Sequence, residues 1–237
     1  MLTTVAALAV AATTLPVSAA PKPAAKPAPV APKPPPVASI TVTAACNGDC
    51  HIILVEGRID SAAAKRFREA VENNKVQRAV IVLNSNGGAA MDGLEIGELV
   101  RERGFSTYLR KGDVCASACA FIWAAGSIQY FPSEGGSSVG FHGAYLLDVN
   151  KNGIPVKGAK PEASPAGNAV VGAYLWQLGY GYAAIRELTK SAPDEMLWLT
   201  SSDQVKELGF HHKYYPTGGD LGAIAAGQNY SVVTKNK

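Results

Sequence analysis

The chain has no excess of charge of either sign outside one short stretch near its start. Its 237 residues include 22 Lys and Arg and 19 Asp and Glu, and three of the basic residues, Lys22, Lys26 and Lys33, stand among prolines. Residues 38–237 therefore hold 22 − 3 = 19 basic and 19 acidic residues, a net charge of zero. Proteins that bind nucleic acids gather Lys and Arg into a basic patch, so this balance argues against a nucleic-acid partner.

The first twenty residues contain no Lys or Arg, and their apolar stretch is too short for a comfortable membrane span. This stretch and the small residues at Val17-Ser18-Ala19 are typical of a secretory signal with its cleavage site. A start codon assigned too far downstream would account for the missing basic residues, and an uncleaved N-terminal membrane tether is the alternative. We expect residues 1–20 to be a signal peptide and the protein to be periplasmic or secreted.

Proline is concentrated in one segment. Residues 21–37 hold eight prolines in seventeen positions, a composition that cannot build a core and is typical of an extended spacer. We expect this segment to be a linker and residues 38–216 to form a single domain with ample core. Residues 217–237 have the composition of a polar, partly disordered tail.

The four cysteines lack the Cys-x2-Cys spacing that is usual for structural zinc, so we expect no metal site. They form two close pairs, Cys46 with Cys50 and Cys115 with Cys119. In an exported protein such cysteines favour disulfides. Four cysteines allow three connectivities, and the sequence does not choose among them.

The apolar patterns predict an α/β domain. Residues 79–83 are an unbroken apolar run rich in branched side chains, which is typical of a buried strand in a parallel sheet. Residues 90–103 follow with the apolar spacing of an amphipathic helix. The remaining pattern predicts strands at 39–45, 52–56, 106–110, 128–131 and 138–142, and helices at 61–74, 117–125, 167–178 and 182–190.

Small residues surround Ser117 where a loop passes into an apolar helix. The run at residues 115–123 is Cys-Ala-Ser-Ala-Cys-Ala-Phe-Ile-Trp. Small neighbours let a substrate carbonyl approach a nucleophilic hydroxyl, and the free N–H groups of a helix N-terminus stabilise a developing oxyanion. Close helix packing explains the same residues without catalysis, so the run needs partners elsewhere in the chain.

Two further motifs would supply those partners. Upstream, Asn-Ser-Asn-Gly-Gly at residues 84–88 ends the apolar strand, and a glycine pair at such a turn lets backbone N–H groups approach a ligand closely. Downstream, His142 ends a short apolar segment and precedes glycine, which predicts a position at the end of a strand. The structural alternatives are a tight turn for the glycines and a packed side chain for His142.

The order of these motifs resembles that of the Clp protease proteolytic subunit and, more broadly, the Clp/crotonase superfamily. Gly88 and Ser117 are 117 − 88 = 29 positions apart, and Ser117 and His142 are 142 − 117 = 25 apart, both about what the Clp family shows. Residues 199–210, with a Ser-x-x-Gln capping box, resemble the family's closing helix before its last strand. The resemblance covers residues 48–215 and implies a superhelical α/β fold of repeated β-β-α units around a mainly parallel sheet.

The resemblance also implies roles for residues. Ser117 matches the nucleophile and His142 the general base, and the backbone N–H groups of Gly88 and Ala118 would form the oxyanion hole. It implies no cofactor, a peptide or unfolded protein as substrate, and a homo-oligomer. No ATPase partner is expected, because an exported enzyme works in a compartment without ATP.

Two positions depart from the family's pattern. Asn86 stands where the family usually has proline before the glycine pair. The acidic residue that orients the histidine should fall near Leu197, counted back from Gly209, and that position is apolar. The nearest acids are Asp194 and Glu195, and we take Asp194 as the candidate third member of the triad.

We therefore expect an exported Clp-like serine peptidase. The alternative, favoured by the two departures, is a catalytically silent protein of the same fold that binds peptides or partner subunits. A crotonase-type acyl-thioester enzyme would keep the oxyanion hole without the serine, but acyl-CoA is cytoplasmic and the signal segment argues against it. A Ser/Lys dyad like that of signal-peptide peptidases finds no lysine at an obvious place.

Two later segments bear on substrate and assembly. The segment 148–166, rich in Gly, Pro and Asn, is expected to be a long loop. It overhangs the site in the family fold, so it is either a substrate flap or a passive insertion. Aromatic residues at 174–182 are expected to be core or subunit contacts.

Overall fold

The computed structural model of the chain describes residues 36–132, 136–150, 156–210, 212–215 and 221–226. The expected signal peptide at 1–20 and nearly all of the expected linker at 21–37 lie outside these ranges, as does most of the expected tail. Within the described ranges, no helix is long and apolar enough to cross a membrane.

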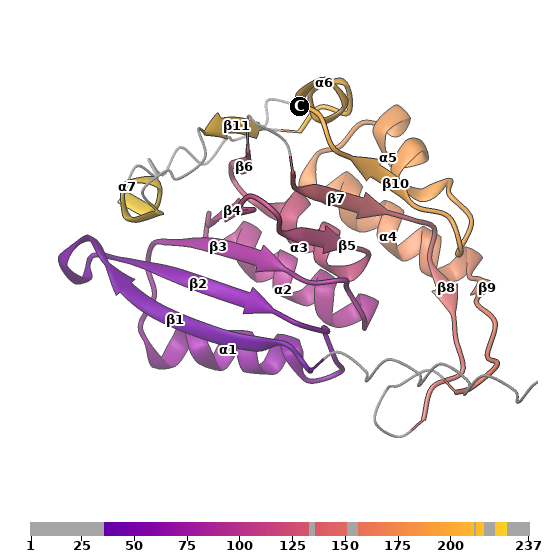
Figure 1. Ribbon diagram of the computed structural model, residues 1–237, viewed down its shortest axis with the longest axis horizontal. Coiled ribbons are helices and arrows are strands. Elements are labelled where there is room, and N and C mark those ends of the chain that lie inside the picture. Colours follow the sequence, from indigo (N-terminus) through magenta and orange to yellow (C-terminus); the bar gives the residue numbers. More distant parts are fainter. Residues whose placement is uncertain (1–35, 133–135, 151–155, 211, 216–220, 227–237) are drawn as a thin grey trace, which may run out of the picture. The chain divides into compact units, whose positions relative to one another are not determined.

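Six strands of the described residues form the larger sheet, in the order β1-β2-β3-β4-β6-β11 (Figure 1). β1 is antiparallel to β2, and every other neighbouring pair is parallel. The apolar run predicted as a buried strand is β3, and its first five residues are buried. The bounds are β1 Ser39–Ala45, β2 Cys50–Glu56, β3 Ala79–Asn84, β4 Ser106–Tyr108, β6 Gln129–Pro132 and β11 His212–Tyr215.

Three strands form a smaller sheet that carries part of the site. Its order is β10-β7-β5, where β5 spans Val114–Ala116, β7 Ser138–Phe141 and β10 Leu197–Leu199. β5 and β7 are parallel, and β10 is antiparallel to β7. A bridge between Ser85 and Cys115 joins β5 to the chain just after β3, so both sheets end near Ser117.

Helix α3, Ala118–Ala125, lies at the centre of the main core, and all eight of its residues are buried. Trp123 on α3 is fully buried, and its ring centroid lies 6.3 Å from that of Phe131 and 4.8 Å from that of Phe210. α2 packs against both α1 and α3 behind the larger sheet (Figure 1). The other helices are α1 Ala63–Asn73, α2 Ala90–Glu102, α4 Pro165–Leu178, α5 Tyr182–Thr189, α6 Ser202–Glu207 and α7 Leu221–Ala226.

The two faces of β3 join different apolar clusters, as the alternation of side chains along a strand requires. Ile81 and Leu83 belong to the main core, whereas Val80 and Val82 belong to a smaller cluster that includes Ala225 of α7. The expectation of a polar tail at 217–237 is therefore wrong for α7. Small and apolar residues there cover the second face of the sheet.

Most predicted strands and helices are present, with ends that differ by a few residues. The capping box of the closing helix is confirmed, because the side chains of Ser201 and Gln204 each accept a backbone N–H of the other's residue. The sequence patterns missed β5 and β10, which are three residues long. They also missed the two-residue strands β8, Tyr145–Leu146, and β9, Glu162–Ala163, which pair with each other.

The expected loop at 148–166 thus contains the short strand β9 and ends in the first two residues of α4, and its residues 151–155 lie outside the described ranges. The aromatic segment divides between core and surface. Tyr174 and Tyr180 are buried and donate hydrogen bonds to carbonyl groups of α3. Trp176 and Tyr182 are 65% and 75% exposed, so the homo-oligomer expected from this segment stays a prediction.

Candidate active site

Ser117 occupies a sharp turn between β5 and α3. Its φ of 56° and ψ of −124° lie in a region that a side chain normally avoids. The N–H of Ser117 donates to Gly140 O at 2.8 Å, and its carbonyl accepts from Ala120 N at 2.8 Å. These bonds hold the strained conformation, which is typical of a nucleophile presented at a strand-to-helix turn.

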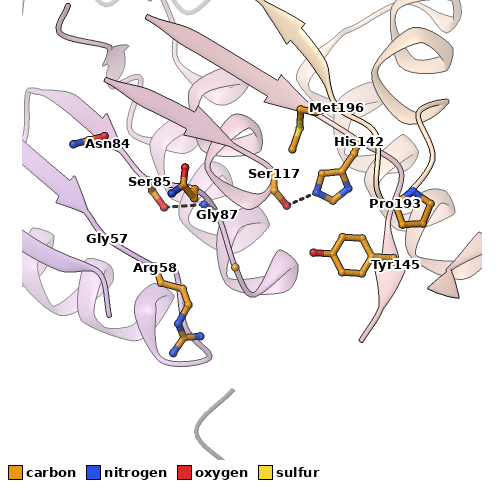
Figure 2. A pocket seen from close by; sticks show the side chains of 12 residues that line it. Gly57, Arg58, Asn84, Ser85, Gly87, Ser117, His142, Tyr145, Pro193 and Met196 are labelled. Carbon is orange, nitrogen blue, oxygen red and sulfur yellow. Dashed lines mark hydrogen bonds between the residues drawn. The ribbon is translucent and has the colours of Figure 1, made fainter. Parts of the chain in front are cut away.

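His142 follows β7 and lies beside Ser117. The parallel pairing of β5 with β7 sets Ala116 against Gly140, so the chain leaves both strands at the same edge of the smaller sheet. His142 Nε2 lies 2.8 Å from Ser117 Oγ, as Figure 2 shows. The structure thus brings together two residues that are 25 positions apart in the sequence.

The hydrogen bond at the second ring nitrogen of His142 sets the tautomer of the neutral ring. Nδ1 lies 2.7 Å from the carbonyl oxygen of Gly143. A carbonyl only accepts hydrogen bonds, so Nδ1 carries the proton and Nε2 of the neutral ring is the acceptor. The Ser117 hydroxyl therefore donates to Nε2, the direction that general-base catalysis requires.

The glycine turn after β3 lies directly against the Ser117 turn. A Cβ atom on Gly87 would stand 2.5 Å from Ala116 O and 2.7 Å from Ser117 Cβ, so only glycine fits there. Its φ of 88° is also in the left-handed region that favours glycine. Ser85 Oγ accepts a hydrogen bond from Gly87 N at 3.0 Å, which holds the turn with Asn86 in place of the family's proline.

Gly88 and Ala118 are the residues expected to form an oxyanion hole. Ile59 N donates to Gly87 O at 3.0 Å and Ala89 N donates to Ile59 O at 2.8 Å. The N–H of Gly88, between them, therefore points away from Ile59. Ala118 is the first residue of α3, where an N–H has no carbonyl of a preceding turn to bind. Neither N–H has a partner among the described residues.

A pocket of about 470 Å³ opens over the Ser117–His142 pair. In Figure 2, Arg58 and Gly87 lie on one side of Ser117, and His142 and Tyr145 lie on the other. Arg58 is the one side chain of fixed charge among the described lining residues, and none of them is lysine. The lining residues are Gly57, Arg58, Asn84, Ser85, Asn86, Gly87, Gly88, Ser117, His142, Tyr145, Pro193 and Met196.

The structure does not bring Asp194 to His142. Asp194 is exposed in the segment before β10, and among the described residues no hydrogen bond or ion pair joins it to the histidine. Leu197, where the family's acid was expected, pairs with Phe141 in the smaller sheet. The position beside Nδ1 is instead taken by the Gly143 carbonyl.

Of the three possible connectivities, the structure has the two neighbouring disulfides, Cys46–Cys50 and Cys115–Cys119. The first closes the turn between β1 and β2, which contains a short 3-10 helix, η1, Cys46–Gly48. The second joins β5 to α3 across Ser117, and both of its cysteines are fully buried. No cluster of three or more His, Cys, Asp or Glu side chains in the described ranges could hold a metal ion.

No protein-family model matches the chain, and no curated protein matches it either. Solved structures do match. A serine-to-alanine mutant of the 1510-N membrane-bound stomatin-specific protease has a TM-score of 0.52 and 17% identity, over 72% of this chain and 80% of that one. A lysine-to-alanine mutant of the same protease, in complex with a substrate peptide, has a TM-score of 0.50 and 21% identity, over 68% of this chain and 73% of that one. An asparagine-to-aspartate mutant of ClpP1 from Listeria monocytogenes has a TM-score of 0.47 and 16% identity, over 70% of this chain and 91% of that one.

With the mainly parallel sheet, the two matches to the 1510-N protease show the fold of the chain, which is Clp/crotonase-like. The predicted fold class is thereby confirmed, and the named neighbours are proteases.

Three residues at the site were not among the predicted ones. Gly143 and Asn168 make hydrogen bonds next to His142, and the Tyr145 ring lies against the His142 ring. Gly143 and Tyr145 are close to His142 in the sequence, which is the signal that could have found them. Asn168 is 168 − 142 = 26 positions further on in a helix, and nothing in the sequence marks it.

Proposed function

We propose that the protein is an exported serine hydrolase, a peptidase in which Ser117 is the nucleophile and His142 the general base. The observation that carries the proposal is the 2.8 Å hydrogen bond from Ser117 Oγ to His142 Nε2. The strained backbone at Ser117 supports it, because such strain persists where function needs the conformation. The pocket over the pair gives a substrate access to the hydroxyl.

In this mechanism Ser117 Oγ attacks the carbonyl carbon of a peptide bond while its proton passes to His142 Nε2. The carbonyl oxygen becomes an oxyanion, which the N–H groups of Gly88 and Ala118 stabilise. The tetrahedral intermediate then collapses, and the leaving amine takes the proton from Nε2. Water hydrolyses the resulting acyl-serine by the same route, and the proton returns to Ser117 Oγ.

The substrate class in this proposal is a short or unfolded peptide. One neighbour of the same fold is named as a protease in complex with a substrate peptide, and the amides of Asn84 and Asn86 are available in the pocket lining to bind the backbone of a peptide. Two disulfides support an oxidising compartment, the periplasm or the outside of the cell. No cofactor or ATPase partner takes part in the mechanism.

A silent peptide-binding protein of the same fold is the second candidate. It is favoured by the exposed position of Asp194, since a carboxylate usually orients the histidine in a serine triad. The two candidates differ in the reactivity of one hydroxyl. A binding protein would need no proton transfer from Ser117 to His142.

Labelling with a fluorophosphonate probe tests the proposal. Wild-type protein should take one probe per chain, Ser117→Ala should take none, and the exposed Ser61→Ala should label like wild type. Ser117→Ala removes one hydroxyl, so its thermal unfolding should stay close to that of wild type. Wild type without label, or full labelling of folded Ser117→Ala, would leave the silent binding protein as the better explanation.

A further inference from the structure

The peptide group between Gly143 and Ala144 stands where a serine triad has its carboxylate. Its carbonyl oxygen accepts the hydrogen bond from His142 Nδ1 at 2.7 Å. Its N–H, on Ala144, donates to Asn168 Oδ1 at 2.6 Å. A continuous chain of hydrogen bonds therefore runs from Ser117 through His142 and this peptide group to Asn168.

Helix α4 holds Asn168 in place from the other side. Ser164 caps the start of α4, and its side chain accepts from Gly167 N at 3.0 Å. Ser164 N donates to Ala144 O at 2.8 Å, and Asn168 N donates to Ser164 O at 2.9 Å. The start of α4 thus bonds both the N–H and the carbonyl of Ala144. These two bonds fix the plane of the Gly143–Ala144 peptide group.

We propose that Asn168 is a positioning residue of the Ser117–His142 pair, acting through the Gly143–Ala144 peptide group in place of an acidic triad member. This inference rests on the proposed hydrolase function. A peptide N–H that donates a hydrogen bond pushes electron density to its own carbonyl oxygen, so successive bonds strengthen one another. The Gly143 carbonyl then stabilises the positive imidazolium that forms as His142 takes the serine proton.

Few charges compete with this effect around the imidazole. Among the described residues, the Ser117 hydroxyl, the Tyr145 ring and, across the pocket, Arg58 face His142. The segment that bonds to Gly143 N through Ser191 O carries Lys190, which is exposed and paired with Glu187. The segment before β10 carries Asp194 and Glu195, both exposed. α4 itself contains no charged residue, so a charge placed at position 168 would be the first on that helix.

Two substitutions of Asn168 separate this role from simple packing. Asn168→Leu keeps the branched shape of the side chain but removes the acceptor, so the imidazolium is less stabilised. The rate of fluorophosphonate labelling should fall about tenfold, and the midpoint of its acidic limb should move to lower pH. Asn168→Asp keeps the acceptor and adds a negative charge, so labelling should stay within about threefold of wild type, and the midpoint should rise by roughly one unit.

Gln177, exposed on the same helix, supplies matched controls. Gln177→Leu and Gln177→Glu make the same changes outside the pocket, and both should leave the rate and the midpoint unchanged. Opposite shifts for the two Asn168 variants would support the relay. Shifts of the same sign, or none, while Ser117→Ala abolishes labelling, would overturn the relay and leave the proposed function standing.

NMR titration of the His142 ring gives a second readout that needs no activity. The resonance is assigned by its loss in His142→Ala. Its titration midpoint should move to lower pH in Asn168→Leu and to higher pH in Asn168→Asp. If Asn168→Leu does not fold, comparing the titration midpoint of Asn168→Asp with that of Gln177→Glu still tests the proposal. An unshifted midpoint in Asn168→Asp would overturn the proposal, even in a protein that takes no probe.

Discussion

The Tyr145 ring lies 5.1 Å from the His142 ring, centroid to centroid, with 32° between the two planes. Tyr145 lines the pocket and is 36% exposed. One face of the proposed general base is therefore covered by an aromatic ring, which attracts a cation. His142 becomes that cation when it accepts the proton of Ser117.

Removal of the Tyr145 ring should slow the reaction. Tyr145→Ala should lower the fluorophosphonate labelling rate about twofold to thirtyfold, because a ring within about 6 Å stabilises a cation by roughly 0.5–2 kcal/mol. Tyr145→Phe keeps the ring and should label like wild type. Tyr182→Ala, which removes an exposed tyrosine outside the pocket, is the control. Loss of labelling in Tyr145→Phe would assign the effect to the hydroxyl instead.

The close approach of Gly87 to the Ser117 turn predicts a steric effect that backbone strain alone does not give. Gly87 and Gly112 have φ values of 88° and 89°, but a Cβ on Gly112 meets nothing within 4 Å. Gly87→Ala should therefore lower labelling by about a hundredfold and reduce stability more than Gly112→Ala does. Labelling rates and urea unfolding of both variants check this. Equal losses would show that strain is the whole effect.

The two disulfides allow a comparison at constant loop length, since each spans a sequence separation of 4. In the chain-entropy account both restrict the unfolded chain similarly. Because only Cys115–Cys119 brackets Ser117, the double variant Cys115→Ala/Cys119→Ala should lose about tenfold in labelling rate. Cys46→Ala/Cys50→Ala should keep the wild-type rate. Similar rates in both variants would show that the turn holds its shape without the bridge.

Asp194 should matter little for the reaction, because the structure leaves it exposed and away from His142. Asp194→Asn should label at close to the wild-type rate. His142→Ala should lose a factor on the order of a hundred to ten thousand, since the serine then has no base. A large loss in Asp194→Asn would mean that the segment before β10 moves the carboxylate to the histidine when substrate binds.

Asp60 should contribute a pH-dependent part of the stability. Burial alone would raise the pKa of Asp60, but hydrogen bonds from Arg66, at 2.9 Å, and from Ala62 N, at 3.1 Å, bring it below its usual range. A carboxyl with a lowered pKa in the folded state stabilises that state above the unfolded pKa, and the contribution is lost as pH falls through the folded pKa.

Urea unfolding at about pH 6 and about pH 2.5 tests this expectation. Asp60→Asn should be less stable than wild type at the higher pH, and the difference should shrink at the lower one. Asp203→Asn, at an exposed carboxylate in the first turn of α6, is the control. If the stability difference between wild type and Asp60→Asn stayed constant with pH, the lowered pKa of Asp60 could not be its cause.

Local signals in the sequence were sufficient for most of the fold. The unbroken apolar run 79–83 indicated a strand buried on both faces, and the spacing of apolar residues after it indicated a helix with one buried face. The sequence patterns missed β5, β8, β9 and β10, because two or three residues are too few to show a period, whereas β4, which is equally short, lies within the predicted strand 106–110. The patterns also missed α7, because its six residues are too few to show a helical period.

The sequence by itself also placed the glycine pair after a strand, Ser117 at the start of an apolar helix and His142 at the end of a strand. Motif order and spacing indicated their partnership before any distance was known. The sequence did not determine what holds the histidine. It offered Asp194, one of the two acids nearest to position 197 along the chain, whereas hydrogen bonding depends on distance in space.

Only the tertiary structure decided which group holds the histidine. The parallel pairing of β5 with β7 sets His142 Nε2 at Ser117 Oγ, and the docking of α4 on Ala144 turns a backbone carbonyl toward Nδ1. A backbone carbonyl exists at every residue and therefore leaves no mark in a sequence. Its direction is set by the contacts of its own peptide group, which here come from a helix more than twenty residues away.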